Sequence, residues 1–152
     1  MSSTIRLNAI QETSICDGPG IRTVLYFQGC HRRCVGCHNP GTWDSDGGVV
    51  WEITHLLQYI REHVVTKRIT LSGGEPLEQM EGVTKLLRQL REEEYDVALY
   101  TGFELDEIPS TLLELVNYVK TGNYRKDLRT TTVAYIGSIN QSFISIRGGD
   151  TK

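Results

Sequence analysis

Three of the four cysteines in this sequence stand close together, in the spacing Cys30-x3-Cys34-x2-Cys37. Thiolates bind zinc and iron–sulfur clusters well, and in a reducing compartment such a group indicates a metal site before a disulfide framework. A structural zinc site is closed by four ligands, whereas a four-iron cluster held by three cysteines leaves its fourth iron open. The spacing therefore predicts either an iron–sulfur cluster with a reactive position or a zinc site.

Zinc stays an alternative at this point, because His31 or His38 could complete its ligand set. The remaining cysteine, Cys16, stands apart from the group. We expect Cys16 to be a small buried side chain rather than a fourth ligand.

The bulk composition favours a globular domain over a nucleic-acid-binding or membrane protein. The 152 residues are 39% apolar and form, in our interpretation, a single domain spanning residues 1–152. The net charge is -3, and the 16 basic and 19 acidic residues are interspersed, so we expect no direct nucleic-acid binding. No apolar run approaches the roughly 20 residues of a membrane helix. We expect a cytoplasmic protein.

Hydrophobic periodicity places strands and helices in alternation along the chain. The predicted strands are Ile5–Ile10, Ile21–Phe27, Arg68–Ser72, Asp96–Tyr100, Leu115–Val119 and Phe143–Ile146. The first predicted helix presents Trp51, Leu56, Leu57 and Ile60 on one face, and follows a loop that extends to about Gly48. The second begins near Pro76 and presents Val83, Leu86, Leu87 and Leu90. A short third helix is expected from near Leu105 to Glu114.

This alternation predicts an α/β fold with right-handed crossovers, either a layered sheet or an incomplete (partial) TIM-like barrel of mostly parallel strands with crossover helices. Active sites in such folds lie beyond the carboxyl ends of the strands. Four segments follow predicted strands: the cysteine loop, Gly73-Gly74-Glu75, Thr101-Gly102 and Lys120-Thr121-Gly122. We expect these segments to meet at one rim.

The sequence around the cysteines resembles a known family. The matching residues are Asp17-Gly18-Pro19-Gly20-Ile21-Arg22, Gln28-Gly29-Cys30, Cys37-His38-Asn39-Pro40 and Thr42-Trp43-Asp44. The cysteine spacing resembles the signature of the radical S-adenosylmethionine superfamily, and the longer stretch resembles its glycyl-radical enzyme activases. The short length and the segments Tyr118–Tyr124 and Gly137–Gln141 resemble those activases that act on anaerobic ribonucleoside-triphosphate reductase.

The resemblance implies a 4Fe-4S cluster on Cys30, Cys34 and Cys37, with S-adenosylmethionine chelated to the open iron. Reductive cleavage of this cofactor would give methionine and a 5'-deoxyadenosyl radical, which would remove a hydrogen atom from one glycine of the reductase. The glycyl-radical subunit of the reductase is thus the implied partner. A flavodoxin or a ferredoxin is the implied electron donor.

The resemblance also assigns residues to the cofactor. Gly73-Gly74-Glu75-Pro76 resembles the family motif for the methionine part, since glycines allow close approach and strand-end carbonyls accept from an ammonium group. Thr101 and Lys120 match family positions near the cofactor, and His38 could pack over it.

Two departures from the family pattern are Tyr100 and Asn117, which stand where many activases carry aspartate. A cation site or carboxylate contact found elsewhere in the family is therefore left open here, although Asn117 can still form hydrogen bonds.

Two other functions compete with the activase. One keeps the radical chemistry but acts on a small molecule, a peptide or another glycyl-radical enzyme. The other is a non-catalytic zinc-binding module, which would stay colourless on anaerobic iron loading.

Overall fold

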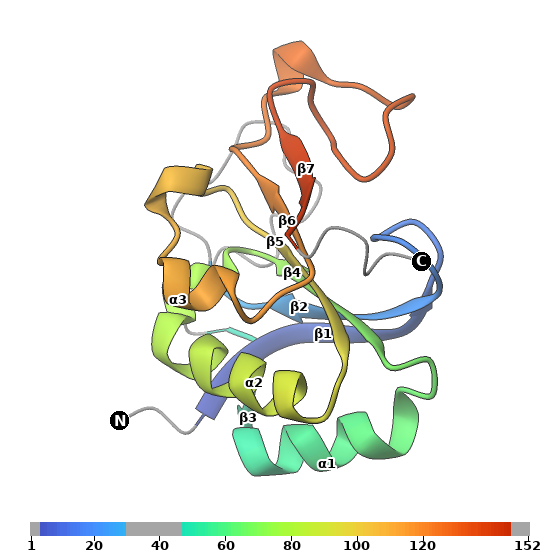
Figure 1. Cartoon of the computed structure of the whole chain (residues 1–152), viewed down its shortest axis with the longest axis vertical. Coiled ribbons are helices and arrows are strands. Elements are labelled where there is room, and N and C mark those ends of the chain that lie inside the picture. Colours follow the sequence, from blue (N-terminus) through green and yellow to red (C-terminus); the bar gives the residue numbers. More distant parts are fainter. Residues whose placement is uncertain (1–3, 30–46, 147–152) are drawn as a thin grey trace.

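The computed structural model describes residues 4–29 and 47–146. Within these ranges one seven-stranded sheet runs through the molecule in the order β3-β1-β2-β4-β5-β6-β7 (Figure 1). The strands are β1 (Thr4–Ser14), β2 (Arg22–Phe27), β3 (Val49–Glu52), β4 (Arg68–Gly73), β5 (Asp96–Tyr100), β6 (Tyr118–Thr121) and β7 (Ser142–Ser145). The predicted α/β fold is confirmed.

Helices connect the central strands. They are α1 (Ile53–His63), α2 (Met80–Glu92) and α3 (Ser110–Leu113), with 3-10 turns at Pro76–Gln79, Leu105–Glu107 and Lys126–Leu128. The predicted apolar face of α2 is confirmed, since Val83, Leu86, Leu87 and Leu90 are all buried. Pro76 occupies the first turn of the 3-10 helix that leads into α2, where its missing amide proton costs nothing.

The sheet is mixed rather than mostly parallel. Strands β2, β4, β5 and β6 are parallel to one another, as the crossover helices require. However, β1 pairs antiparallel with both β2 and β3, and β7 pairs antiparallel with β6. The expectation of mostly parallel strands was wrong at the edges, because no α-helix joins β1 to β2 or β6 to β7. A short connection joins β1 to β2, and the longer segment from β6 to β7 contains only the 3-10 turn Lys126–Leu128.

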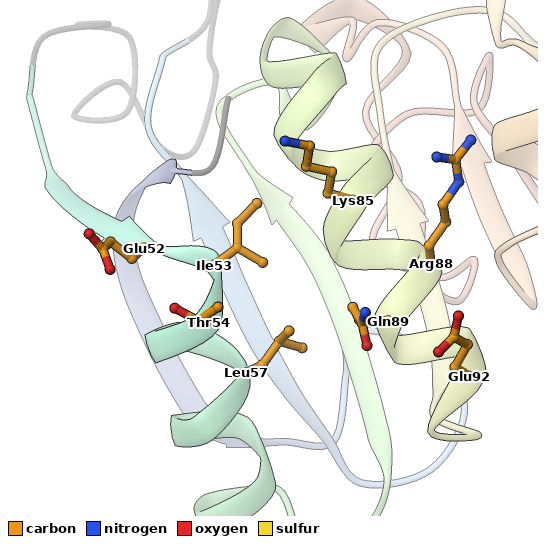
Figure 2. Close-up of a pocket in the computed structure, with 8 residues that line it drawn as sticks. All are labelled: Glu52, Ile53, Thr54, Leu57, Lys85, Arg88, Gln89 and Glu92. Atoms are coloured by element: carbon orange, nitrogen blue, oxygen red, sulfur yellow. The ribbon is translucent and has the colours of Figure 1, made fainter. Parts of the chain in front are cut away.

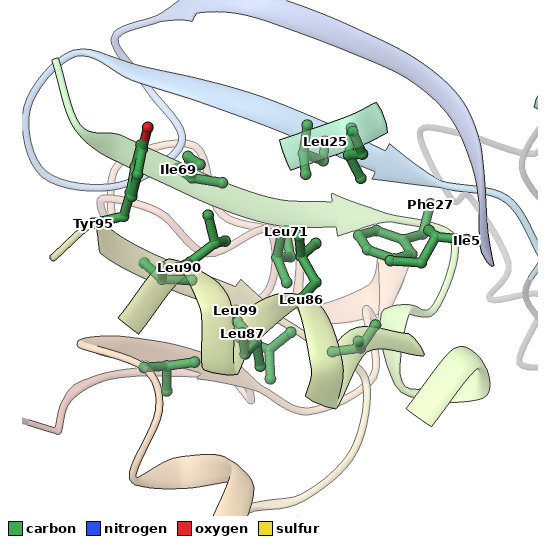
Figure 3. Close-up of a cluster of buried hydrophobic side chains, with 14 of the residues drawn as sticks. Ile5, Leu25, Phe27, Ile69, Leu71, Leu86, Leu87, Leu90, Tyr95 and Leu99 are labelled. Atoms are coloured by element: carbon green, nitrogen blue, oxygen red, sulfur yellow. The ribbon is translucent and has the colours of Figure 1, made fainter. Parts of the chain in front are cut away.

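The main core lies between the sheet and the helices. Figure 3 shows Leu86, Leu87 and Leu90 of α2 beside Ile69, Leu71 and Leu99 of the strands, and all six are fully buried. Strand side chains alternate between faces, so the residues next to these in sequence point to the other face of the sheet. There, Ala98, Tyr100 and Tyr118 form a second cluster with Tyr135 and Phe143. No helical residue belongs to this second cluster as described.

Three element predictions need correction. Trp51 does not belong to the first helix but to edge strand β3, where it pairs with Ile5, and α1 begins at Ile53. The strand predicted at Leu115–Val119 instead spans Tyr118–Thr121, because Ala98 of β5 fixes its register by pairing with Tyr118. The helix expected from Leu105 to Glu114 divides into a 3-10 turn and α3, with Pro109 between them.

None of the helices in the described part of the chain has the length and apolar character needed to cross a bilayer.

Candidate active site at the carboxyl ends of the strands

The carboxyl ends of β2 and β4 are joined by main-chain hydrogen bonds. The amide of Gly74 donates to the carbonyl of Phe27 at 3.0 Å, and the amide of Glu75 donates to the carbonyl of Gly29 at 2.8 Å. Gly73 has a φ of +110°, and a Cβ built there would lie 2.3 Å from the amide nitrogen of Phe27. Only glycine fits at this close approach of two strands.

The side chain of Glu75 joins β4 to β5. This carboxylate is buried, with 1% of its surface exposed. Its Oε2 accepts from the hydroxyl of Thr101 at 2.6 Å and from the amide of Leu77 at 3.1 Å, and its Oε1 accepts from the amide of Gly102 at 2.7 Å. Both carboxylate oxygens therefore bind groups of the protein, which makes Glu75 a brace for the two loops around it.

The same rim continues to β6. The amide of Thr101 donates to the carbonyl of Lys120 at 2.9 Å, and the amide of Gly122 donates to the carbonyl of Phe103 at 3.0 Å. The predicted convergence of Gly73–Glu75, Thr101–Gly102 and Lys120–Gly122 is thus confirmed.

Four of the predicted site residues lie outside the described residues: Cys30, Cys34, Cys37 and His38. Gly29, the residue before Cys30, does lie at this rim. Within residues 4–29 and 47–146, no group of three or more His, Cys, Asp or Glu side chains is placed to hold a metal ion.

Comparison with known proteins identifies the family. A family model described as a 4Fe-4S single cluster domain matches residues 16–144. An anaerobic ribonucleoside-triphosphate reductase-activating protein of Escherichia coli (strain K12) is 31% identical over 138 residues, which cover 84% of this chain and 90% of that protein. The chain belongs to the radical S-adenosylmethionine activases of glycyl-radical enzymes. Family membership gives the activase an iron–sulfur cluster and S-adenosylmethionine as its cofactors.

Two further relatives of the activase differ in how much of their length is matched. The reductase-activating protein of Enterobacteria phage T4 is 32% identical over 145 residues, covering 88% of this chain and 92% of that protein. Pyruvate formate-lyase 1-activating enzyme of Escherichia coli (strain K12) is 37% identical over 131 residues, covering 78% of this chain but 52% of that enzyme.

A solved structure also shares the fold of the activase. The crystal structure of QueE from Escherichia coli superimposes with a TM-score of 0.56 and 18% identity, over 78% of this chain and 70% of that chain.

The two positions that depart from the family pattern have different surroundings in this activase. The side-chain oxygen of Asn117 accepts from the amide of Val97 at 3.0 Å, so the expected hydrogen bonding of Asn117 is confirmed. Tyr100 is 6% exposed, and the Nζ atom of Lys120 lies 4.4 Å from the centre of its ring. Burial raises the pKa of Tyr100, and the nearby charge of Asp17 raises it further.

Arg22, at the amino end of β2, is a buried residue whose structural role the sequence did not reveal. Its guanidinium donates to Thr70 Oγ1 at 2.9 Å, to the carbonyl of Pro19 at 2.7 Å and to Asp96 Oδ1 at 2.6 Å. Thr70 in turn donates to the carbonyl of Asp17 at 2.6 Å. The Asp17–Arg22 motif is therefore anchored to β4 and β5 of the activase by its own arginine.

The prediction that Cys16 is buried was wrong. Cys16 is exposed rather than buried, because it lies in the turn that follows β1, where the chain leaves the sheet. Ser14 pairs with Arg22 at the start of β2, whereas Cys30 follows the end of that strand. Cys16 therefore lies at the opposite end of β2 from Gly29.

A groove of about 520 Å³ lies on the helical side of the activase, between α1 and α2 (Figure 2). Its α2 wall carries Lys85, Arg88, Gln89 and Glu92, and its other wall runs from Glu52 to Leu57. Among the predicted site residues that the structure describes, none lines this groove.

Proposed function

We propose that this activase makes a glycyl radical on anaerobic ribonucleoside-triphosphate reductase, using S-adenosylmethionine and a 4Fe-4S cluster that is held by Cys30, Cys34 and Cys37. The observation that carries the choice of partner is the extent of the match. Reductase-activating proteins align over 90% and 92% of their length, whereas the pyruvate formate-lyase-activating enzyme aligns over 52%. The match to the reductase-activating proteins therefore spans nearly the whole of their length.

The residues at the rim fit these cofactors. Three thiolates suit a four-iron cluster with one open iron, and the first of them follows Gly29, which is bonded to Glu75. When bound, the cluster and S-adenosylmethionine supply one-electron reductive cleavage to methionine and a 5'-deoxyadenosyl radical, which becomes 5'-deoxyadenosine by taking the glycine hydrogen.

The protein's own residues would bind and orient the cofactor. The carbonyls of Gly73 and Gly74 lie at the end of β4 and suit the ammonium group of the methionine part. Glu75 holds this turn against Thr101 and Gly102. We assign Thr101, Lys120 and His38 to the same cofactor, with Glu75 acting through the loops that it braces.

The partner needs access to this rim, and the fold is suited to such access. We propose that residues 1–152 form one domain and that its sheet is an incomplete, partial TIM-like barrel. Its face opposite the helices carries the cluster of Ala98, Tyr100 and Tyr118 without a covering helix among the described residues. A glycine-bearing loop of a large protein substrate can approach such a face.

The remaining partners follow from the same proposal. The electron would come from a flavodoxin or a ferredoxin in the cytoplasm, a reducing compartment that keeps the thiolates available. The proposal includes no nucleic-acid partner and no membrane partner, in keeping with a net charge of -3 and interspersed charges.

Pyruvate formate-lyase is the second candidate substrate. The activating enzyme of Clostridium pasteurianum is 40% identical over 102 residues, a higher identity than that of the reductase-activating proteins. That match covers 43% of the activating enzyme, so more than half of that enzyme has no aligned counterpart in this chain. This makes pyruvate formate-lyase the weaker candidate.

The deciding experiment offers both substrates to the same activase. The protein is reconstituted anaerobically with iron and sulfide, reduced, and mixed with S-adenosylmethionine and either reductase or pyruvate formate-lyase. We expect 5'-deoxyadenosine together with a glycyl-radical signal in electron spin resonance on the reductase alone. A signal on the lyase alone would transfer the assignment to the second candidate. Nucleoside without any protein radical would point to a small-molecule or peptide substrate, and a colourless protein to a zinc module.

A further inference from the structure

A long segment joins β6 to β7 beside the rim of the candidate site. It spans residues 122–141, because β6 ends at Thr121 and β7 begins at Ser142. The 3-10 turn Lys126–Leu128 is the one helical element in it. Connections longer than about 12–15 residues without helices or strands of their own are uncommon in compact domains, and an ordered one is usually functional. We call this segment the β6–β7 arm.

Side-chain hydrogen bonds hold the β6–β7 arm in one shape. The buried side chain of Gln141 donates from Nε2 to the carbonyl of Gly122 at 2.9 Å, which ties the two ends of the arm together. Its Oε1 accepts from the amides of Gly137 and Ser138 at 2.8 and 3.2 Å. Ser138 Oγ in turn accepts from the amide of Arg125 at 3.1 Å. Because the arm is already ordered, little conformational entropy is lost when a partner binds it.

The middle of the arm folds back on itself. The amide of Ile139 donates to the carbonyl of Leu128 at 2.8 Å. The amide of Thr130 donates to the carbonyl of Gly137 at 3.0 Å. Figure 1 shows the arm, in orange to red, projecting from the sheet past the end of β6 and away from α1 and α2. Small-molecule sites are concave, so a projecting arm suits a protein partner better.

The exposed side chains of the arm combine apolar and basic groups. Ile139 and Val133 are 62% and 49% exposed. Lys126 and Arg129 are exposed as well, and neither forms an ion pair with a described residue. The arm has three basic residues and one acidic residue, in a chain whose net charge is -3. A basic surface of this kind is complementary to an acidic surface on a partner.

The arm is continuous with the rim. Its first residue, Gly122, donates to the carbonyl of Phe103 and follows the strand that carries Lys120. Further along, the ring of Tyr135 packs against Phe143 of β7, with ring centres 4.8 Å apart, in the cluster on the face opposite the helices. A glycyl-radical enzyme brings its glycine to this rim. The protein surface around that glycine therefore comes close to the arm.

We propose that the β6–β7 arm is a docking surface for the glycyl-radical subunit of anaerobic ribonucleoside-triphosphate reductase. An acidic surface of that subunit faces Lys126 and Arg129, and an apolar surface covers Ile139. The inference rests on the proposed function, because it takes the reductase as the partner.

The first test reverses charge on the arm of the reconstituted holoenzyme. It compares the double variant Lys126→Glu plus Arg129→Glu with the double variant Arg88→Glu plus Arg91→Glu. The second double variant is a matched control, since it makes the same change in net charge on exposed side chains of α2, on the helical side. Binding to purified reductase is measured by surface plasmon resonance at low and at physiological ionic strength.

The second test removes apolar surface and compares Ile139→Ser with Val65→Ser. Val65 is 88% exposed and lies just before β4, at the amino ends of the parallel strands. Equilibrium dialysis of S-adenosylmethionine and thermal unfolding report whether each variant keeps its cofactor site and its fold.

The arm double variant is expected to weaken reductase binding about 10-fold or more at low ionic strength, and less at physiological ionic strength because salt screens the charges. Ile139→Ser should weaken it about 5-fold or more. Both controls should bind the reductase like the wild type. The arm variants should bind S-adenosylmethionine like the wild type and lose no more thermal stability than the controls.

Wild-type reductase binding by the arm variants would overturn the inference and leave the proposed function intact. This holds even if those variants change self-association or reduction by flavodoxin, since the arm would then serve another protein. An equal loss in arm and control variants would also overturn it, as would a parallel loss of cofactor binding. A wild type that neither binds nor activates the reductase would overturn the proposed function, and the inference with it.

Discussion

The main-chain amide of Glu75 donates a 2.8 Å hydrogen bond to the carbonyl of Gly29, the residue directly before Cys30. This bond fixes the point at which the cysteine loop leaves the sheet relative to the turn that contains Gly73 and Gly74. The start of the proposed cluster site and the proposed methionine site therefore share one strand pair. A change that loosens this pair is expected to affect both sites.

The first prediction concerns the cysteine ligands. Cys34→Ala should prevent cluster assembly, because a cluster held by two thiolates lacks the ligand set that the proposed function requires. Cys16→Ser is the matched control and should retain its cluster, since Cys16 lies at the opposite end of β2. Iron and sulfide analysis with visible absorption measures both. Normal iron content in Cys34→Ala would refute the ligand assignment.

The second prediction concerns the brace made by Glu75. Glu75→Gln should lower the free energy of unfolding by about 1–3 kcal/mol. The substitution replaces one carboxylate oxygen by an amide NH2 group, which cannot accept the hydrogen bond that the wild-type oxygen accepts. The two oxygens of Glu75 currently accept from Leu77, Thr101 and Gly102. Urea denaturation measures the loss.

The control for this brace is Glu92→Gln, which removes an exposed carboxylate at the end of α2. It should change stability by no more than about 0.5 kcal/mol. Equal stability of Glu75→Gln and Glu92→Gln would show that the internal bonds of Glu75 do not stabilise the rim.

The third prediction concerns Arg22, whose side chain has no exposed surface. Arg22→Met should lower the free energy of unfolding by about 2–4 kcal/mol, less than for a fully buried ion pair because the Asp96 side chain is 27% exposed. Arg125→Met breaks an exposed ion pair with Asp127 and should cost at most about 0.5 kcal/mol. Calorimetry of both variants checks the ranking, and a smaller loss for Arg22→Met would contradict it.

The fourth prediction concerns pH. Arg61 donates to both carboxylate oxygens of Glu93, at 3.0 and 2.7 Å, and thereby lowers the pKa of Glu93 below its ordinary value of 4.5. The stability that this pair contributes is fully present above pH 4.5 and is lost as the pH falls through the lowered pKa. Wild type should therefore exceed Glu93→Gln in stability at pH 7, and the excess should be smaller at pH 3.

Denaturation of the iron-free proteins at these two pH values measures the difference. Glu62→Gln is the control, since the Glu62 carboxylate accepts from the neutral side chain of Gln58. A gap between wild type and Glu93→Gln that stayed constant with pH would assign the effect to packing instead of charge.

Local patterns predicted the central elements of this fold well. The bounds of β5 match the prediction at both ends, and β4 differs from it by one residue. These strands are short apolar runs that end at glycine or at a turn, so local signals suffice. Trp51 was misplaced because β3 exists through pairing with Thr4–Leu7, a contact between residues far apart in sequence. Short segments of this kind carry no periodicity that would reveal their partner.

The candidate site, too, has one part that the sequence predicted and one part that it did not. The meeting of Gly73–Glu75, Thr101–Gly102 and Lys120–Gly122 was predictable, because parallel strands place their carboxyl ends together. The bonds that Glu75 forms with Thr101 and Gly102 were not, since they depend on the direction in which one buried side chain points. The hydrogen bonds of Arg22 were hidden for the same reason.

Both ends of the cysteine loop are fixed at neighbouring points of the folded sheet. Gly29 is bonded to Glu75, and Gly48 lies so close to β1 and Gln28 that an added Cβ would be 2.6 Å from the carbonyl of Leu7 and 3.0 Å from Gln28. Folding of β1, β2 and β3 therefore brings the two ends of the loop together, so the entropic cost of closing the loop is offset before iron binds. In the proposed function, its thiolates would then act at a high effective concentration toward one cluster. Under that proposal, edge strand β3 would thus become a determinant of how tightly the activase retains iron.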